Sequence, residues 1–516
     1  MIKVNRALLS AYDKEGLPEL AEVLASLDVE LVSSGGTAAL LREHGLKVRE
    51  VGDLTGFPEM LGGRLKTLHP KLLGGLLYRR TSDEDVSQVE EHGLIPVDMV
   101  VVDFYPFERA AAAGDSMTEA EKIELIDIGG PTMVRAAAKN WAHVLVLTDP
   151  GRYEEAAVRL KEGGGKVSPE FSRAMAVEAF RKTCIYDAMI SRELGASEAE
   201  MFPLTYVRGF RRKTLLRYGE NPHQKAALYV EPGREGGVAG SDPLHGKALS
   251  FNNLWDLQAA WDAVAEFDRP ACVVVKHRNP CGVATADDPA TAFVKARDAD
   301  ALSAFGGVIA FNREVDTAAS EAVASSFFEC VVAPAYEDAA LERLKKKKNL
   351  RLLKVDRAAG RSAGPVERGL GGGLLIEEHD PPGVVPEMKP VTENEPTSSE
   401  IDDLRFAWAV AKHVTSNSIV LAKDGVTVGI GSGQTSRIDA LNVAIMKAER
   451  ADADVKGAVM ASDGFFPFRD CVDRAHEMGI TAVVQPGGSV RDSESIEAAD
   501  SHGMAMLFTG RRCFRH

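Results

Sequence analysis

The sequence predicts an α/β protein with more than one domain. Its 516 residues are too many for one hydrophobic core, and 45% of them are hydrophobic, as is usual for a globular chain. Short β-branched runs alternate with segments whose apolar residues recur at helical spacing; residues 7–12, for example, precede Leu20, Val23 and Leu24. This alternation favours parallel sheets covered by helices, with ligands at the carboxyl ends of the strands.

Composition and charge exclude several classes of protein. The net charge of −15 argues against a general nucleic-acid binder, which needs excess positive charge to displace phosphate counterions. The six cysteines are scattered without a C-x-x-C pair, so we expect neither a disulfide scaffold nor a thiolate zinc site, and we expect a cytoplasmic location. We find no signal-peptide pattern and no apolar run that would span a bilayer, so we expect no membrane association.

Polar loops follow the strands predicted in the first 150 residues. Residues 33–37, Ser-Ser-Gly-Gly-Thr, separate a strand at 29–32 from a helix at 38–44. Such a loop aims backbone N–H groups at an anion, although ordinary strand–helix turns look the same. Residues 62–71 combine two glycines with three cations, which suits a phosphate. Residues 126–132 precede a helical segment at 133–141, on which Arg135 and Lys139 share one face.

A lysine and a histidine stand where a buried strand at residues 271–275 ends. The Asn-Pro-Cys-Gly at residues 279–282 predicts a tight turn, which would let Lys276 and His277 face one site. A cation beside a group that titrates near neutral pH suits acyl transfer. The residues alone equally allow a strand end whose polar side chains face water.

The last hundred residues repeat this rhythm. Strands at 418–422 and 426–430 flank an Asp-Gly pair that predicts a hairpin, and residues 431–437 then open a helix. Between the halves, residues 345–400 predict a loop-rich insertion that begins with a lysine run at a solvated helix end.

With these motifs in view, the chain resembles the bifunctional purine-biosynthesis proteins that join AICAR (phosphoribosylaminoimidazolecarboxamide) formyltransferase to IMP cyclohydrolase. The stretches that carry the resemblance run through the chain in family order: residues 33–37, 62–70, 126–130, 135–140, 217–224, 276–282, 429–437, 462–470 and 512–516.

The resemblance implies a domain plan. Residues 1–198 would form the cyclohydrolase domain with a methylglyoxal-synthase-like fold. Residues 199–516 would form the transferase from two cytidine-deaminase-like α/β halves, at about 199–345 and 400–516. The family acts as a homodimer on AICAR, formyl-AICAR and IMP, with 10-formyltetrahydrofolate as the formyl donor.

The resemblance also implies the residues of the cyclohydrolase site. Its substrate-binding residues would be Lys14, Ser34, Gly35, Gly36, Thr37, Arg64 and Thr67. Its catalytic residues would be Lys66, Tyr105, Asp127 and Lys139, the last for proton transfer. The family usually has Asn at the position of Asp103. Because a carboxylate near a nucleotide phosphate needs neutralising, we expect Asp103 to pair with a lysine of the site.

In the transferase, the resemblance makes His277 the base for the AICAR amine and Lys276 the cation for the oxyanion. The implied AICAR contacts are Arg217, Tyr218, Gly307, Asn417 and Arg437. The implied folate contacts are Phe465, Asp470, Ser489 and Arg512, although aromatics such as those at 465–468 are usually core residues.

Two other functions have to be weighed. A zinc deaminase needs H-x-E and P-C-x-x-C, but Ala284 stands where the second cysteine would be, so we expect no zinc. A nucleotide sensor or scaffold would keep the pockets without turnover, yet it could discard Lys66, Lys139, Lys276 and His277, and all four are present. Turnover separates these alternatives.

Overall fold

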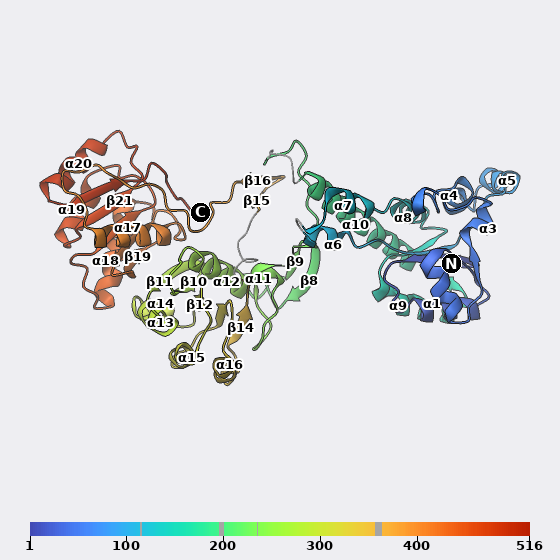
Figure 1. The fold of residues 1–516 in the computed structure, drawn as a ribbon, viewed down its shortest axis with the longest axis horizontal. Coiled ribbons are helices and arrows are strands. Elements are labelled where there is room, and N and C mark those ends of the chain that lie inside the picture. Colours follow the sequence, from blue (N-terminus) through green and yellow to red (C-terminus); the bar gives the residue numbers. More distant parts are fainter. Residues whose placement is uncertain (114–115, 196–200, 235, 357–363) are drawn as a thin grey trace. The chain divides into compact units, whose positions relative to one another are not determined.

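The computed structural model describes residues 1–113, 116–195, 201–234, 236–356 and 364–516. These residues form two compact units, and Figure 1 colours the chain from one end to the other. The first unit consists of Met1–Arg211 and Glu231–Arg234, and the second takes the rest of the described chain. The predicted boundary at residue 198 lies within residues 196–200, outside the described residues.

The first unit contains a parallel sheet of five strands in the order β4-β3-β2-β5-β6. The strands are β2 (Arg6–Ala11), β3 (Glu30–Ser33), β4 (Val48–Glu50), β5 (Met99–Asp103) and β6 (Leu145–Leu147). Because all five run in one direction, their carboxyl ends share one edge of the sheet. The loops after Ala11, Ser33 and Asp103 therefore meet at that edge.

Helices cover both faces of this sheet. Helices α1 (Leu17–Ser26) and α9 (Tyr153–Glu162) lie side by side on one face (Figure 1). The other face carries α4 (Pro70–Leu77), α8 (Gly129–Lys139) and most of α10 (Pro169–Leu194). Smaller elements complete the unit: α2 (Gly35–Glu43), α3 (Val51–Thr55), α5 (Asp83–Glu91), α6 (Phe107–Ala113), α7 (Glu119–Glu124), and the pair β1 (Ile2–Lys3) and β7 (Lys166–Val167).

The second unit is built on a mixed sheet of eleven strands in the order β14-β13-β12-β10-β11-β19-β18-β20-β21-β22-β17. The first half supplies β10 (Ala271–Lys276), β11 (Asn279–Thr285), β12 (Val308–Phe311), β13 (Cys330–Ala333) and β14 (Arg351–Lys354). The second half supplies β17 (Lys389–Pro390), β18 (Ile419–Lys423), β19 (Val426–Gly431), β20 (Val459–Ser462), β21 (Ala482–Gln485) and β22 (Ala505–Phe508). Two further strand pairs are β8 (Arg211–Leu216) with β9 (Ala226–Val230) and β15 (Val366–Leu370) with β16 (Gly373–Glu377).

The two halves repeat one arrangement. Each begins with a hairpin, β10–β11 or β18–β19, whose first strand pairs antiparallel with β12 or β20. From there β12, β13 and β14 run parallel in the first half and β20, β21 and β22 in the second, where β17 adds an antiparallel edge strand. The halves meet where β11 pairs antiparallel with β19. The two hairpin turns consequently lie at opposite ends of the sheet.

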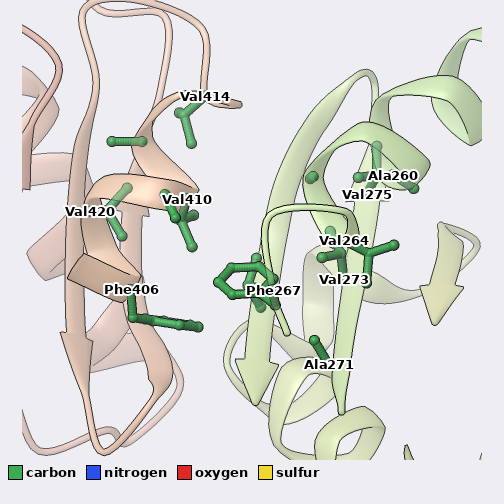
Figure 2. Packing of buried hydrophobic residues seen from close by; sticks show 14 of the residues in the cluster. Ala260, Val264, Phe267, Ala271, Val273, Val275, Phe406, Val410, Val414 and Val420 are labelled. Carbon is green, nitrogen blue, oxygen red and sulfur yellow. The ribbon is translucent and has the colours of Figure 1, made fainter. Parts of the chain in front are cut away.

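One hydrophobic cluster joins the halves. It lies between one face of the sheet and the helices α12 (Phe251–Val264) and α17 (Ser398–Ala411), and in it the rings of Phe267 and Phe406 lie 5.3 Å apart (Figure 2). Other helices cover the opposite face: α13 (Pro289–Asp298), α15 (Thr317–Ala324), α16 (Asp338–Lys345), α18 (Arg437–Arg450), α19 (Asp470–Glu477) and α20 (Asp492–Ser501). The short helices α11 (Gly237–Gly240) and α14 (Ala301–Ala304) complete the unit.

These elements confirm the predicted α/β class. The lysine run does follow a helix end, since α16 ends at Lys345 and the next three lysines are exposed. Strands β14, β15, β16 and β17 lie within the segment predicted to be a loop-rich insertion, and residues 357–363 of that segment lie outside the described residues. None of the helices formed by the described residues combines the length and the apolar character needed to cross a membrane.

Candidate active sites

The first candidate site lies at the carboxyl edge of the parallel sheet. Helix α2 begins at Gly35 rather than at Ala38, so the glycines form its first turn. Two ammonium groups cover that turn: a Cβ added at Gly35 would lie 2.7 Å from Lys66 Nζ, and one at Gly36 would lie 3.6 Å from Lys14 Nζ. Cations beside the N-terminus of a helix form an arrangement that can bind a phosphate.

The neighbouring predicted residues Thr37, Thr67 and Arg64 each contact a different part of the unit. The Thr37 hydroxyl lies 3.2 Å from the carbonyl oxygen of Ala11, so it fastens α2 to β2. Thr67 reaches the start of α8, because a Cβ at Gly129 would lie 2.7 Å from its Oγ1. Arg64 forms an ion pair with Glu124.

Asp127 closes the start of α8. Its Oδ1 accepts the Gly130 N–H at 2.8 Å, and its own N–H donates to the Tyr186 hydroxyl at 2.7 Å. Burial raises the pKa of Asp127, and the charge of Asp103 adds to this shift. The Tyr105 ring lies 5.5 Å from that of Tyr12 and is half exposed, so its hydroxyl is available to a ligand.

Asp103 does pair with a lysine, as we expected, but with Lys182 of α10 rather than with a lysine predicted for the site. The Lys182 ammonium also donates to the Thr148 carbonyl oxygen. The other Asp103 oxygen accepts the Asp13 N–H at 3.1 Å, in the loop that carries Lys14. The pair thus neutralises the added carboxylate and fixes the position of the Lys14 loop.

Lys139 lies elsewhere in this unit. It ends α8, whose first residue is Gly129, so the two are separated by about 15 Å along the helix axis. Lys139 lines a surface hollow of about 570 Å³ with Arg135, Trp141 and Phe180 among its neighbours. Within this chain, the structure does not bring Lys139 to the residues at the carboxyl edge.

The second candidate site is built on the β10–β11 hairpin, and here the predicted turn was misplaced. Residues 279–282 belong to β11, and the turn consists of His277 and Arg278, both in the left-handed region with φ of 52° and 67°. Pro280 stays in the strand because a bulge leaves Cys281 unpaired, and Cys281 donates its thiol to the Val274 carbonyl oxygen. Burial raises the pKa of that thiol to about 12, so it is protonated at neutral pH.

Left-handed backbone is unusual for residues other than glycine and costs about 1–2 kcal/mol per residue. His277 and Arg278 are exposed and adjoin Lys276. The Lys276 ammonium donates to the Phe305 carbonyl oxygen at 2.6 Å. This bond holds the loop that leads to the predicted contact Gly307, whose added Cβ would lie only 2.8 Å from the Val275 carbonyl oxygen.

Residues from the second half join this hairpin. The Asn279 Oδ1 accepts the Thr415 N–H at 2.9 Å, which places the hairpin two residues from Asn417. The Asn417 Oδ1 in turn accepts a hydrogen bond from Arg437 at 2.8 Å. Arg437 also forms a buried ion pair with Asp463. The structure thus brings His277, Asn417 and Arg437 to one end of the sheet.

The predicted folate contacts surround the same strand ends. Phe466 is a core residue, but Phe465 and Phe468 are about half exposed and can stack against a ring. Arg512 lies over the Phe514 ring at 4.8 Å, and a Cβ at Gly464 would touch both Phe514 and Arg437. Asp470 begins α19. The Ser489 hydroxyl accepts the N–H of Arg491, whose guanidinium covers Phe468.

The last two predicted contacts lie together after β8. The Arg217 guanidinium stacks on the Tyr218 ring at 5.2 Å. The same loop reaches α12, since Asn252 donates to the Glu220 carbonyl oxygen at 3.2 Å.

Two family models and a curated relative match this chain. Residues 137–447 match the family model described as AICARFT/IMPCHase bienzyme, and residues 16–132 match that of the MGS-like domain. The chain is 49% identical over 517 aligned positions to the bifunctional purine biosynthesis protein PurH of Persephonella marina, which covers 99% of this chain and all of that protein.

This chain belongs to the AICARFT/IMPCHase family. Like other AICARFT/IMPCHase proteins it is a bifunctional enzyme of purine biosynthesis, which formylates AICAR and then closes formyl-AICAR to IMP. The predicted methylglyoxal-synthase-like N-terminal fold is confirmed as well. Among solved structures, the crystal structure of ForH aligns with 35% identity over 38% of this chain and 99% of that chain, with a TM-score of 0.34.

The sequence analysis did not identify four residues that stabilise one or the other candidate site. They are Lys182, Asp256, Asn279 and Asp463. Asp463 and Asn279 lie inside stretches that resemble the family, and that position was the available signal. Lys182 lies 79 residues from Asp103 on a long helix, and nothing local to it indicates a partner.

Proposed function

We propose that the first unit closes formyl-AICAR to IMP and that the second unit transfers the formyl group from 10-formyltetrahydrofolate to AICAR. The observation that carries the transferase assignment is the Asn279–Thr415 hydrogen bond, because it joins the His277 turn of one half to the Asn417 and Arg437 contacts of the other. The Lys14 and Lys66 ammonium groups over α2 support the cyclohydrolase assignment.

In the transferase, the AICAR amine attacks the formyl carbon of the donor. His277 takes the amine proton as the new C–N bond forms, and Lys276 stabilises the tetrahedral oxyanion. The bond from the formyl carbon to the folate nitrogen then breaks, and that nitrogen leaves with the proton that His277 had accepted. Lys276 has donors to spare for this task, because an ammonium carries three N–H groups and one of them bonds Phe305.

The donor site lies around residues 465–489 and Arg512 in this proposal. Exposed Phe465 offers a face for the pterin ring, with Asp470 and Ser489 as polar contacts. Arg217, Tyr218 and Gly307 complete the AICAR pocket. The enzyme acts as a cytoplasmic homodimer.

In the cyclohydrolase, the carboxamide nitrogen attacks the formyl carbon and water is lost. Ser34, Gly35, Gly36, Thr37, Arg64 and Thr67 anchor the phosphate together with Lys14. Lys66, Tyr105 and Asp127 surround the reacting groups. Lys139 moves a proton in this proposal. Within its own chain Lys139 lies about the length of α8 away from the other residues of the site, so it has to reach the substrate from there.

The proposal is tested by separating the two reactions. The protein, mixed with AICAR and 10-formyltetrahydrofolate, should produce IMP, and a sensor or scaffold would not. His277→Ala should abolish formyl transfer and leave the closure of supplied formyl-AICAR intact, whereas Lys139→Ala should do the reverse.

Lys276→Ala should lower formyl transfer, because it removes the cation proposed for the oxyanion. Lys423→Ala is its matched control, since Lys423 ends the equivalent strand of the other hairpin. It should retain formyl transfer. A folded His277→Ala protein that loses both reactions would overturn the two-site assignment.

A further inference from the structure

The two hairpin turns of the transferase unit have the same backbone conformation. His277 and Arg278 have φ of 52° and 67°, and Asp424 and Gly425 have φ of 54° and 69°. Both hairpins also carry a bulge in the ladder, between Val274 and Val275 or between Leu421 and Ala422. Two positive φ values in succession define the type I′ turn.

A helix caps each turn with one aspartate. Asp256 of α12 accepts the Arg278 N–H at 2.7 Å, and the His277 N–H lies near enough to its carboxylate to lower the pKa of Asp256. Asp403 of α17 accepts the N–H groups of Asp424 and Gly425 at 2.9 and 2.7 Å. Burial raises the pKa of Asp256, and the two N–H groups offset part of that shift. The two aspartates therefore have the same structural role, which is to accept hydrogen bonds from the backbone of a hairpin turn.

The two turns differ in how much they need the cap. Asp-Gly is among the pairs that type I′ turns prefer, because glycine takes positive φ without a steric penalty. Histidine and arginine lack that freedom, so their left-handed backbone depends on outside support. Besides Asp256, the support comes from Trp255, whose ring lies 4.7 Å from the Arg278 guanidinium.

We propose that Asp256 is a positioning residue for formyl transfer, which holds the His277–Arg278 turn in the left-handed conformation that presents His277 beside Lys276. The inference rests on the proposed role of His277. Asp256 does not touch the reacting atoms in this account; it acts through the backbone N–H groups of the turn. Asp403 performs the same task at the opposite end of the sheet, where no predicted catalytic residue lies.

The two equivalent hairpins allow a test with an internal control. Kinetic constants for formyl transfer are measured for Asp256→Asn and for its matched control Asp403→Asn, and closure of supplied formyl-AICAR is measured in the same preparations. We expect Asp256→Asn to lower kcat/KM for transfer about 100-fold, through kcat, because a misplacement of about 1 Å has that effect. Asp403→Asn should transfer at the parent rate, and both should close the ring normally.

A rescue variant distinguishes positioning from general damage. Asp256→Asn combined with Arg278→Gly should recover most of the transfer activity, since glycine adopts positive φ without the cap. If Asp256→Asn does not fold, Asp256→Glu and Asp403→Glu provide the same comparison with the carboxylate displaced by one methylene.

Equal transfer rates in the Asp256 and Asp403 variants, or a folded double variant without recovery, would overturn the inference. Its failure is distinguishable from that of the proposed function. If His277→Ala transfers normally, the proposed function fails; if it is inactive while Asp256→Asn equals the parent, only the positioning role fails.

Discussion

Gly431 lies where β19 passes closest to α18, and replacing it with alanine should damage formyl transfer. A Cβ at this position would lie 1.8 Å from the backbone carbonyl oxygen of Ala440. The obstacle is backbone rather than a flexible side chain, so helix and strand must separate by about 1.6 Å to reach an ordinary contact. Overpacking of this kind costs about 1–3 kcal/mol of stability.

The displacement would be transmitted to the site because Arg437 is the first residue of α18. Its hydrogen bond to Asn417 is 2.8 Å long, and the added separation would stretch it beyond the limit of about 3.5 Å. A shift of about 1 Å in a contact of this type lowers an enzymatic rate about 100-fold. We therefore expect Gly431→Ala to reduce kcat/KM for formyl transfer by about that factor.

The assay compares transfer and ring closure in one protein. Closure is the reaction that we propose for the other unit, so it should be unchanged, which controls for expression of the protein. Gly369→Ala, in β15, is the matched substitution, because no atom lies within 4 Å of its added Cβ. Parent-like transfer by a folded Gly431→Ala protein would refute the reasoning, since it would mean that α18 can move without disturbing Arg437.

Three further predictions concern buried charges. Asp463→Asn should lower the free energy of unfolding by about 3–5 kcal/mol, because the Asp463 side chain is fully buried and its loss leaves Arg437 without a counter-charge; denaturant titration checks this, and a loss below about 1 kcal/mol contradicts it. Lys182→Met should raise KM for ring closure and cost about 1.5–3 kcal/mol of stability, since it leaves the Asp103 carboxylate without its partner. Adding Asp103→Asn to the same chain should restore both KM and stability. A double variant that is no better than the single one counts against the pairing. Asp127→Asn should abolish closure yet stabilise the protein above the acid range. Burial raises the folded pKa of Asp127, so the folded chain holds this proton to higher pH than the unfolded chain, and the parent loses stability as pH rises through the window above the unfolded value of about 3.9. Unfolding curves at several pH values should show that this loss is absent from Asp127→Asn; an identical pH dependence in both proteins would be incompatible with the shift.

The strands and the Asp-Gly hairpin were predictable because local signals and tertiary packing agree there. The buried run of β10 and the β18–β19 hairpin lie within a residue or two of the predicted positions. Helix starts were less predictable. Gly35 and Gly129 were placed in loops, because glycine disfavours helix interiors, yet the first turn of a helix tolerates it.

The candidate sites were predictable as motifs but not as geometry. Asn-Pro-Cys-Gly has the chemistry of a turn, and sheet pairing with a bulge overrode it in β11. Lys182 and Asp463 act through partners 79 and 26 residues away, which no local pattern encodes. The separation of Lys139 from the carboxyl edge depends on the direction of α8 across the sheet, and that follows only from the strand order.

The repeat within the transferase separates what folding requires from what function adds. For folding alone, a hairpin of this conformation with an aspartate cap can use Asp-Gly at its turn, and the hairpin of the second half has this pair. In the first half the same conformation is imposed on His277 and Arg278, whose own preferences oppose it. Folding gains nothing from that exchange, because the Asp-Gly alternative is available and less strained. When the backbone conformation at one of two equivalent turns opposes the preference of its residues, those residues are expected to have been selected for catalysis or binding rather than for folding. The left-handed turn therefore favours a functional role for His277 on physical grounds that do not depend on family resemblance.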